Sequence, residues 1–273
     1  MVLVPPVISS HTNYGGPHVV AQNAPAESYF DRALSLIEKS REETSEKSNY
    51  LDFHRERLQY VVRLCERLWP AAENARVLDI GRSELSRLLA ERFRNLETMG
   101  FALSDDAGGH TTSWRMPGAH HVFDLNQAWA PDQWPAAKGF DVIVMAEVIE
   151  HLHTAPELVL TMLNSMLAPG GYLIVQTPNA AAIHKRLKLL LGKNPNERIR
   201  PYHMNPGHFR EYTKAELIEI GRAAGLETVL HEYVDYFGCT GGGAKRLLNA
   251  VYKATLSRIS GLRRGQTIVY RRA

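Results

Sequence analysis

The sequence predicts an α/β fold in which a mostly parallel sheet follows a helical N-terminal extension. From about residue 71 onward, short apolar runs alternate with segments of helical periodicity, which is typical of βαβ units. Before that point, apolar residues repeat at helical spacing over residues 27–69, and Pro70 ends the pattern. We therefore expect a mobile tail over residues 1–25, a helical extension or cap over 26–70, and one α/β domain over 71–273.

The elements of the α/β domain follow from its apolar runs and its helical periods. Seven runs predict strands, at residues 76–80, 96–103, 120–123, 140–145, 172–176, 227–236 and 266–271. Helices are expected between them, notably over residues 83–94, 155–167 and 214–224. The run Pro169-Gly170-Gly171 predicts a turn before the fifth strand. Because ligands of parallel sheets bind beyond the carboxyl ends of the strands, the site is expected in the loops after the first four.

Composition and charge exclude several classes of protein. The 273 residues are 44% hydrophobic, which is ample for one large core, and the net charge of +3 does not indicate a dedicated nucleic-acid binder. Cys65 and Cys239 lie far apart, so we expect no disulfide framework, and Cys65 falls on an apolar helical stripe typical of a core. The N-terminus lacks a signal-peptide pattern and no apolar stretch could span a bilayer, so a cytoplasmic location is expected.

Two strand ends carry residues suited to a nucleotide-like ligand. In VLDIG, residues 77–81, a strand ends in Asp79 and Gly81 before a helix begins. The glycine lets a ligand approach the backbone, and the helix N-terminus offers N–H groups to a carboxylate. A dehydrogenase could begin in this way, but its GxGxxG fingerprint is absent. In FDLN, residues 123–126, Asp124 could accept a hydrogen bond from an adenine amino group or could simply cap a turn.

A third segment is the most specific. FDVIVMAEVIEHL, residues 140–152, is followed at helix-plus-strand distance by PGGYLIVQTPN, residues 169–179. With these motifs, residues 76–273 resemble the class I S-adenosylmethionine-dependent methyltransferases, in particular the branch of ubiquinone-biosynthesis O-methyltransferases and glycan-cluster methyltransferases. The resemblance implies a Rossmann-like, seven-stranded, mostly parallel sheet of order 3-2-1-4-5-7-6 with the last strand antiparallel.

The resemblance also implies a cofactor, S-adenosylmethionine, and positions that bind it. Asp79 and Gly81 match residues that line the methionine part, while Asp124 and Leu125 match residues that contact adenine. The backbone near Ala146 matches the position that receives the amino group of methionine.

Two positions depart from the family pattern. Only Gly81 remains of the glycine-rich loop, and Arg82 and Ser83 follow it. Either these two residues contact the cofactor carboxylate, or the loop has lost its binding function. The family's ribose-binding acid is replaced by Ala102, and Asp105 or Asp106 just beyond could substitute for it or could simply be solvated.

Arg57 precedes the α/β domain. It matches an arginine that binds the cofactor carboxylate in the ubiquinone branch. Its local sequence alone indicates an ordinary solvated helix residue.

Acidic and imidazole side chains gather after the fourth strand. Glu147, Glu150 and His151 are spaced so that they can converge, and His208 would join them from a later loop. The resemblance to the ubiquinone branch and to small-RNA 3′-end methyltransferases implies that these four residues hold Mg²⁺ or Mn²⁺ near the acceptor hydroxyl. Without a metal, His151 or His208 would be the general base, and Glu147 would act beside them or only support the structure. The groups could also serve only as caps and packing residues.

Two insertions are expected to build the acceptor side. The first, residues 179–212, is basic, which suits a phosphorylated or otherwise acidic acceptor or else a solvated charged helix. The second, residues 241–265, combines an apolar and a basic helical face. Residues 242–264 could therefore pack on the core, form a homodimer contact, or lie on a membrane surface.

These observations together favour S-adenosylmethionine-dependent methyl transfer to an oxygen of a small-molecule or glycan-type acceptor. A metal-dependent RNA ribose 2′-O-methyltransferase would share the Glu-x-x-Glu-His pattern, but the near-neutral charge speaks against nucleic acid. A catalytically degenerate cofactor-binding or scaffold protein is the other alternative, because the glycine loop is reduced.

Overall fold

The computed structural model describes residues 48–69, 74–102, 118–201, 206–235 and 258–273, together with the single residues 243, 250, 252 and 255. Within them, seven strands form one sheet of order β3-β2-β1-β4-β5-β7-β6, which confirms the implied order. The strands are β1 (Arg76–Ile80), β2 (Asn95–Gly100), β3 (His120–Val122), β4 (Phe140–Ala146), β5 (Leu167–Pro178), β6 (Leu226–Val234) and β7 (Gly265–Arg272). The α-helices are α2 (Ser48–Leu68), α3 (Glu84–Arg92), α4 (Pro156–Met166), α5 (Ile183–Leu190) and α6 (Lys214–Ala223).

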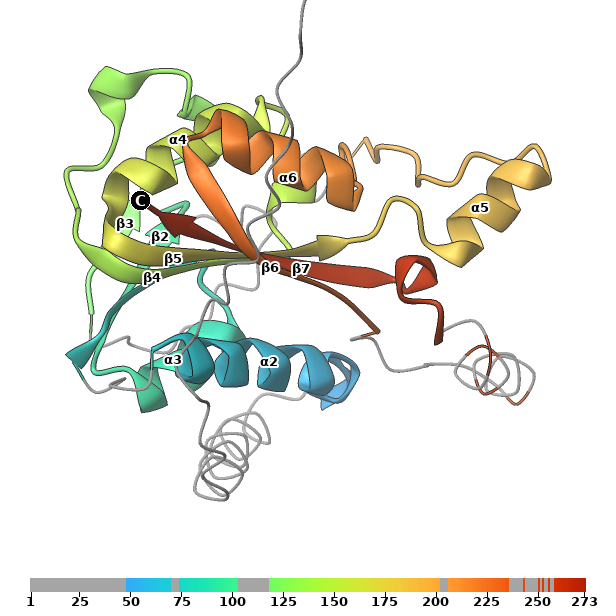
Figure 1. The fold of residues 1–273 in the computed structure, drawn as a ribbon, viewed down its shortest axis with the longest axis horizontal. Helices are drawn as coiled ribbons and strands as arrows, with labels where there is room; N and C mark the ends of the chain where they lie inside the picture. The colour runs from blue at the N-terminus through green and yellow to red at the C-terminus, as the bar shows by residue number, and fades with distance from the viewer. Residues whose placement is uncertain are drawn as a thin grey trace, which may run out of the picture.

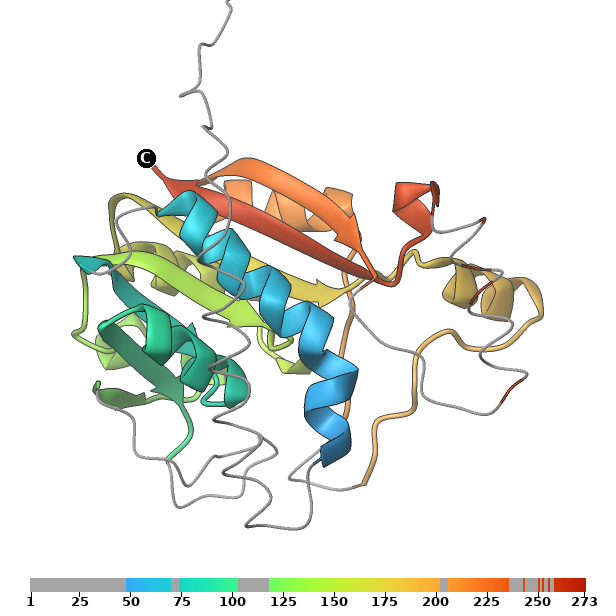
Figure 2. The same cartoon turned by 90° about the horizontal axis from the view of Figure 1, so that it is seen from below.

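The sheet is mostly parallel and lies between two layers of helices. Strands β1 to β5 pair in parallel, whereas β7 runs antiparallel to both β5 and β6. Helices α2 and α3 cover one face and α4 and α6 cover the other (Figure 1). Helix α5 projects beyond the sheet, as both views show (Figure 2).

Alternating side chains explain the two layers. Val142 and Val144 of β4 pack with the α2 and α3 side, whereas Ile143 and Met145 pack with the α4 and α6 side. A strand that is buried on both faces reads as a continuous apolar run, which is why the central strands could be predicted. Cys65 is fully buried on the α2 side, as expected of a core residue, and burial raises the pKa of its thiol.

The predicted turn at Pro169-Gly170-Gly171 is wrong, because these residues lie inside β5. The pairing of β4 with β5 jumps from Phe140 opposite Leu167 to Val142 opposite Tyr172, so the three residues form part of a bulge. A Cβ at Gly171 would lie 2.9 Å from the carbonyl oxygen of Phe140. Glycine is therefore needed there for close backbone approach rather than for a chain reversal.

Several predicted segments lie outside the described residues. These are the tail, the first part of the helical extension, Asp105 and Asp106, and most of residues 236–257. The described part of the extension is the single helix α2. Of the helices that the structure describes, none is long and apolar enough to cross a membrane.

Candidate active site

The site lies at the carboxyl ends of the central strands, and Asp79 of β1 is its first acid. Asp79 is buried, and its Oδ2 accepts a hydrogen bond from the Ser86 hydroxyl at 2.5 Å. Burial raises the pKa of Asp79 to about 7, against the opposing effects of the Ser86 hydrogen bond and the charge of Arg57. A carboxylate held in this way favours a neighbouring cationic ligand.

The loop after β1 turns at Gly81 and then caps α3. Gly81 has a φ of 84° and donates its N–H to the carbonyl of Met99 at 2.8 Å. The Ser83 hydroxyl accepts from the N–H of Leu85, and the N–H of Ser83 donates to the Ser86 hydroxyl. The Ser83 hydroxyl, which we expected to contact the cofactor carboxylate, is therefore already engaged in capping α3. Arg82 is half-buried, and burial lowers the pKa of its guanidinium.

A second glycine, which sequence reasoning missed, stands beside this loop. A Cβ placed on Gly100, the last residue of β2, would lie 3.8 Å from the Cα of Gly81. The two strand ends thus approach each other without a side chain from either glycine. The signal was a glycine inside the strand predicted over residues 96–103, which in the structure ends at Gly100.

Arg57 reaches the same place from α2. Its side chain is buried and donates to the Gln176 amide oxygen at 3.5 Å and to the His54 ring at 3.3 Å. Its charge lowers the pKa of Asp79 and of Glu147, although burial raises both more strongly. The solvated-helix interpretation of Arg57 is therefore wrong.

The residues expected near adenine and the methionine amino group occupy strand ends as well. Asp124 caps a short 3-10 helix, and its Oδ1 accepts from the N–H of Asn126 at 2.9 Å, which confirms the local cap interpretation. Leu125 is buried directly after it. Ala146 is half-buried at the end of β4.

Two carboxyl groups follow β4, those of the half-buried Glu147 and the buried Glu150. Glu147 has a φ of 56°, and Glu150 lies in the 3-10 helix η4 (Ile149–His151). The Glu150 Oε2 accepts from the Thr177 hydroxyl at 2.9 Å, while one oxygen of each carboxyl group has no hydrogen-bond partner within the described residues. Burial raises the pKa of both groups, and the charge of Glu147 raises that of Glu150 further. A shared proton or a nearby cation would stabilise such a pair.

Two imidazoles stand at the edge of this acid pair, and hydrogen bonds fix their tautomers. The Nδ1–H of His151 donates to the carbonyl of Gly207, and that of His208 donates to a Glu211 oxygen, each at 3.0 Å. Because those acceptors carry no proton to donate, each Nε2 keeps its lone pair. Burial lowers the pKa of both rings, that of His208 to about 4.

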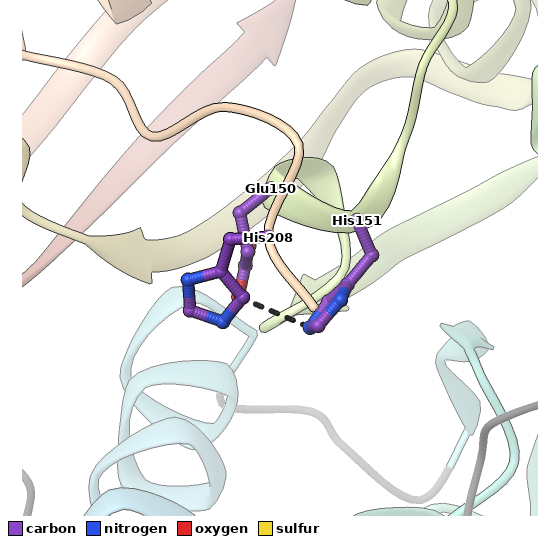
Figure 3. Close-up of side chains that lie close together, drawn as sticks. All are labelled: Glu150, His151 and His208. Carbon is purple, nitrogen blue, oxygen red and sulfur yellow. Dashed lines mark ion pairs between the residues drawn. The ribbon is translucent and has the colours of Figure 1, made fainter. Parts of the chain in front are cut away.

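The structure brings together three of the four expected metal ligands. Glu150, His151 and His208 each offer one ligand atom, and these atoms lie within 4.8 Å of one another (Figure 3). The two rings meet edge to face with centroids 4.8 Å apart. Glu147 lies beside Glu150 and is not part of this group.

Lys185 and Glu211 were missed as site residues. Lys185, in the first turn of α5, is 6% exposed and pairs with Glu211, which in turn holds His208. Burial lowers the pKa of Lys185 to about 8. The alternative that this segment is a solvated charged helix is therefore wrong at Lys185. The signal for Glu211 was its position three residues after His208, where a side chain can support the ring.

Comparisons with known proteins identify the family and the fold. A family model described as a methyltransferase domain matches residues 53–231. One solved structure with a similar fold is a SAM-dependent methyltransferase from Archaeoglobus fulgidus. The match has a TM-score of 0.50 and 18% identity and covers 82% of this chain and 100% of that one. The second is an S-adenosylmethionine-dependent methyltransferase from Mesorhizobium loti, with a TM-score of 0.50 and 12% identity over 78% and 97% of the two chains.

A third solved structure includes bound ligands. It is the 1,6-didemethyltoxoflavin-N1-methyltransferase of Burkholderia thailandensis with 1,6-didemethyltoxoflavin and S-adenosylhomocysteine, at a TM-score of 0.50 and 15% identity over 96% and 98% of the chains. No curated protein matches the chain. Identities this low show the fold alone, but the family match spans more than half of the sequence. The chain belongs to the methyltransferase-domain family and is a class I S-adenosylmethionine-dependent methyltransferase.

Proposed function

We propose that the protein methylates an oxygen of a small-molecule or glycan-type acceptor. The observation that carries this proposal is the pair of Nε2 lone pairs on His151 and His208, held beside the buried Glu150 carboxyl group. S-adenosylmethionine supplies a methyl group bound to a positively charged sulfur. The acceptor oxygen attacks that carbon, the carbon–sulfur bond breaks with its electrons passing to sulfur, and the acceptor proton leaves to a base.

The cofactor side of the site rests on groups that suit an amino-acid tail. We assign the methionine part to Asp79 and Gly81, its amino group to the backbone near Ala146, and its carboxylate to Arg57. The buried acid with a raised pKa beside a buried guanidinium matches a ligand that carries one charge of each sign. Asp124 and Leu125 would border the adenine.

Arg82 lies next to the loop glycine and is a second candidate for the cofactor carboxylate. Its guanidinium is half-buried, so an anion near it would be shielded from water in part. Ser83 could take part only if its cap to α3 opened, because its hydroxyl already accepts the N–H of Leu85.

The acceptor side rests on the two imidazoles as general bases. A ring whose pKa lies below its usual range is neutral near pH 7 and can accept a proton there. As His208 becomes charged, the Glu211 carboxylate at its Nδ1 stabilises the imidazolium. Glu147 would act as a further acid beside Glu150, whose pKa its charge raises.

The same residues fit a divalent ion such as Mg²⁺ or Mn²⁺. Glu150, His151 and His208 would hold it, because each Nδ1 is already fixed by an oriented acceptor, as in many metal sites. The ion would lower the pKa of an acceptor hydroxyl. Activity that survives chelation would assign proton removal to the imidazoles alone, whereas loss with recovery on adding Mn²⁺ would assign it to the ion.

Calorimetry with S-adenosylmethionine and S-adenosylhomocysteine tests the cofactor site. We expect saturable binding by the wild-type chain and at least tenfold weaker binding by Arg57→Ala, because the buried guanidinium is the proposed carboxylate ligand. Arg94→Ala, an exposed arginine just after α3, is the matched control. If both ligands gave no binding heat and no thermal shift, the result would contradict the proposal and favour a degenerate scaffold.

Labelled S-adenosylmethionine and a panel of acceptors test the chemistry. We expect transfer to phenolic or sugar hydroxyls, with a loss of 10²-fold or more in His151→Ala combined with His208→Ala while cofactor binding is retained. Transfer to amines only would contradict oxygen methylation. Transfer to RNA ribose would favour the RNA alternative instead.

A further inference from the structure

Helix α5 carries its apolar stripe on the outside. Ile183, Leu187, Leu190 and Leu191 are spaced i, i+4, i+7 and i+8, so they lie along one side of the helix. In a helix that packs on a core, such a stripe is buried. Here Leu190 is 82% exposed and Leu191 is 71% exposed.

The opposite side of α5 is the one that faces the protein. Lys185, which lies across the helix from the stripe, is buried and pairs with Glu211 in the active site. The helix projects away from the sheet in both views (Figure 1, Figure 2). The outward direction of the leucines is therefore fixed by a polar contact at the base of the helix.

The apolar residues continue past the helix together with positive charge. Leu189 and Ile199 are also more than half exposed. Residues 186–200 carry five exposed basic residues and one acid, a net charge of +4, whereas the whole chain carries only +3. The basic residues are Arg186, Lys188, Lys193, Arg198 and Arg200.

We propose that residues 186–200 form a docking surface for an anionic phospholipid membrane. The leucines would enter the boundary between headgroups and acyl chains, and the basic residues would meet lipid phosphates. A second copy of this chain is a poorer occupant, because a symmetric contact would set the +4 segment against itself. This inference does not depend on which acceptor is methylated.

Vesicle sedimentation with the full chain tests the proposal. We expect binding to vesicles of equal parts phosphatidylglycerol and phosphatidylcholine, and at least tenfold weaker binding to phosphatidylcholine alone or in 0.5 M salt. Replacing Leu187, Leu190 and Leu191 together by Ser should weaken binding at least tenfold. The matched control replaces Leu158 and Ile218, exposed residues of α4 and α6, by Ser and should bind like wild type.

Charge variants give a second measurement. Lys188→Glu and Lys193→Glu should each weaken binding to the anionic vesicles about fivefold or more, since each basic residue near such a surface adds roughly that factor. Arg222→Glu, which changes an exposed side chain of α6, should have a smaller effect. Because these side chains are exposed, the variants should keep the wild-type Tm.

Three results would overturn the proposal. One is the absence of sedimentation with anionic vesicles, and another is wild-type binding by the triple serine variant. The third is a lipid-free dimer that the same variant dissociates, in a protein that does not sediment with vesicles. That outcome would assign the leucines to a contact between two copies.

Discussion

At the scale of single residues, the site concentrates charge that water does not reach. Asp79 and Glu150 are buried and Glu147 is half-buried near neighbouring strand ends, and the charge of Arg57 acts on all three. Burial raises the pKa of each acid, so the ionised carboxylates of the site cost folding free energy. Binding of a charged ligand would offset part of that cost, which links cofactor binding to stability.

Asp79→Asn should therefore stabilise the protein while it weakens cofactor binding. The folded pKa of about 7 lies above the ordinary 3.8, so stability falls as pH rises between these values and stays low above 7. We expect the variant to gain about 2–4 kcal/mol in free energy of unfolding at pH 8 and less at pH 5. Urea unfolding at both pH values and calorimetry with S-adenosylmethionine measure this.

The control for this prediction is Asp132→Asn, an exposed acid that should leave both quantities unchanged. An Asp79→Asn protein that is less stable at pH 8 than wild type would contradict the account of buried charge.

Some site residues could be predicted from the sequence and others could not. Asp79 and Gly81 end the first apolar run, so their position beside the sheet mouth follows from the strand itself. Arg57 was interpreted as solvated, and Lys185 was assigned either to a basic lid or to a solvated helix, because long cations on a helix are usually exposed. Their burial depends on what packs over them, which local periodicity does not encode.

At the scale of elements, close packing of α6 on β7 depends on one glycine. A Cβ at Gly221 would lie 2.2 Å from Cε1 of Tyr270, whose ring is buried and whose hydroxyl donates to the carbonyl of Leu217 at 2.6 Å. An added methyl group would therefore force the ring or the helix to shift. Helix propensity alone would favour alanine there by about 1 kcal/mol.

Gly221→Ala should nonetheless destabilise the protein by about 1–3 kcal/mol, because overpacking outweighs propensity. Thermal and urea unfolding measure the change. Gly261→Ala, where an added Cβ meets no atom within 4 Å, should stay within about 0.5 kcal/mol of wild type. A more stable Gly221→Ala variant would show that the ring relaxes freely.

Element positions were easier to predict than their pairing. The run at residues 76–80 matches β1 in full, because buried strands are short apolar stretches bounded by turn residues. The start of β5 was missed by five residues, since Pro169 and the two glycines carry a local turn signal. Only contact with β4, far away in sequence, makes them a bulge.

At the scale of the whole molecule, the last strand completes the sheet. Strand β7 lies between β5 and β6 and pairs with both, and its Ile268, Val269 and Tyr270 are fully buried. No local pattern gives this order, because it joins segments about 30 to 100 residues apart. The strand order could be predicted only from the resemblance to known methyltransferases.

Removing residues 265–273 should abolish cooperative folding. Without β7, strand β6 has no partner and the edge of β5 is left open, so we expect aggregation or loss of the thermal transition. Removing Ala273 alone should change little, because that residue is exposed. Near-ultraviolet circular dichroism and soluble yield are the readouts. A truncated protein with a wild-type transition would contradict the central place of β7.

The backbone of Glu147 has a consequence for the protein's evolution. A side chain in the left-handed region costs on the order of 1 kcal/mol, which a glycine would recover. Directed evolution for heat resistance, run without an activity screen, would therefore enrich glycine at this position and discard an acid of the proposed catalytic group. A homologue with glycine at this position would gain stability and would lack the carboxyl group of Glu147.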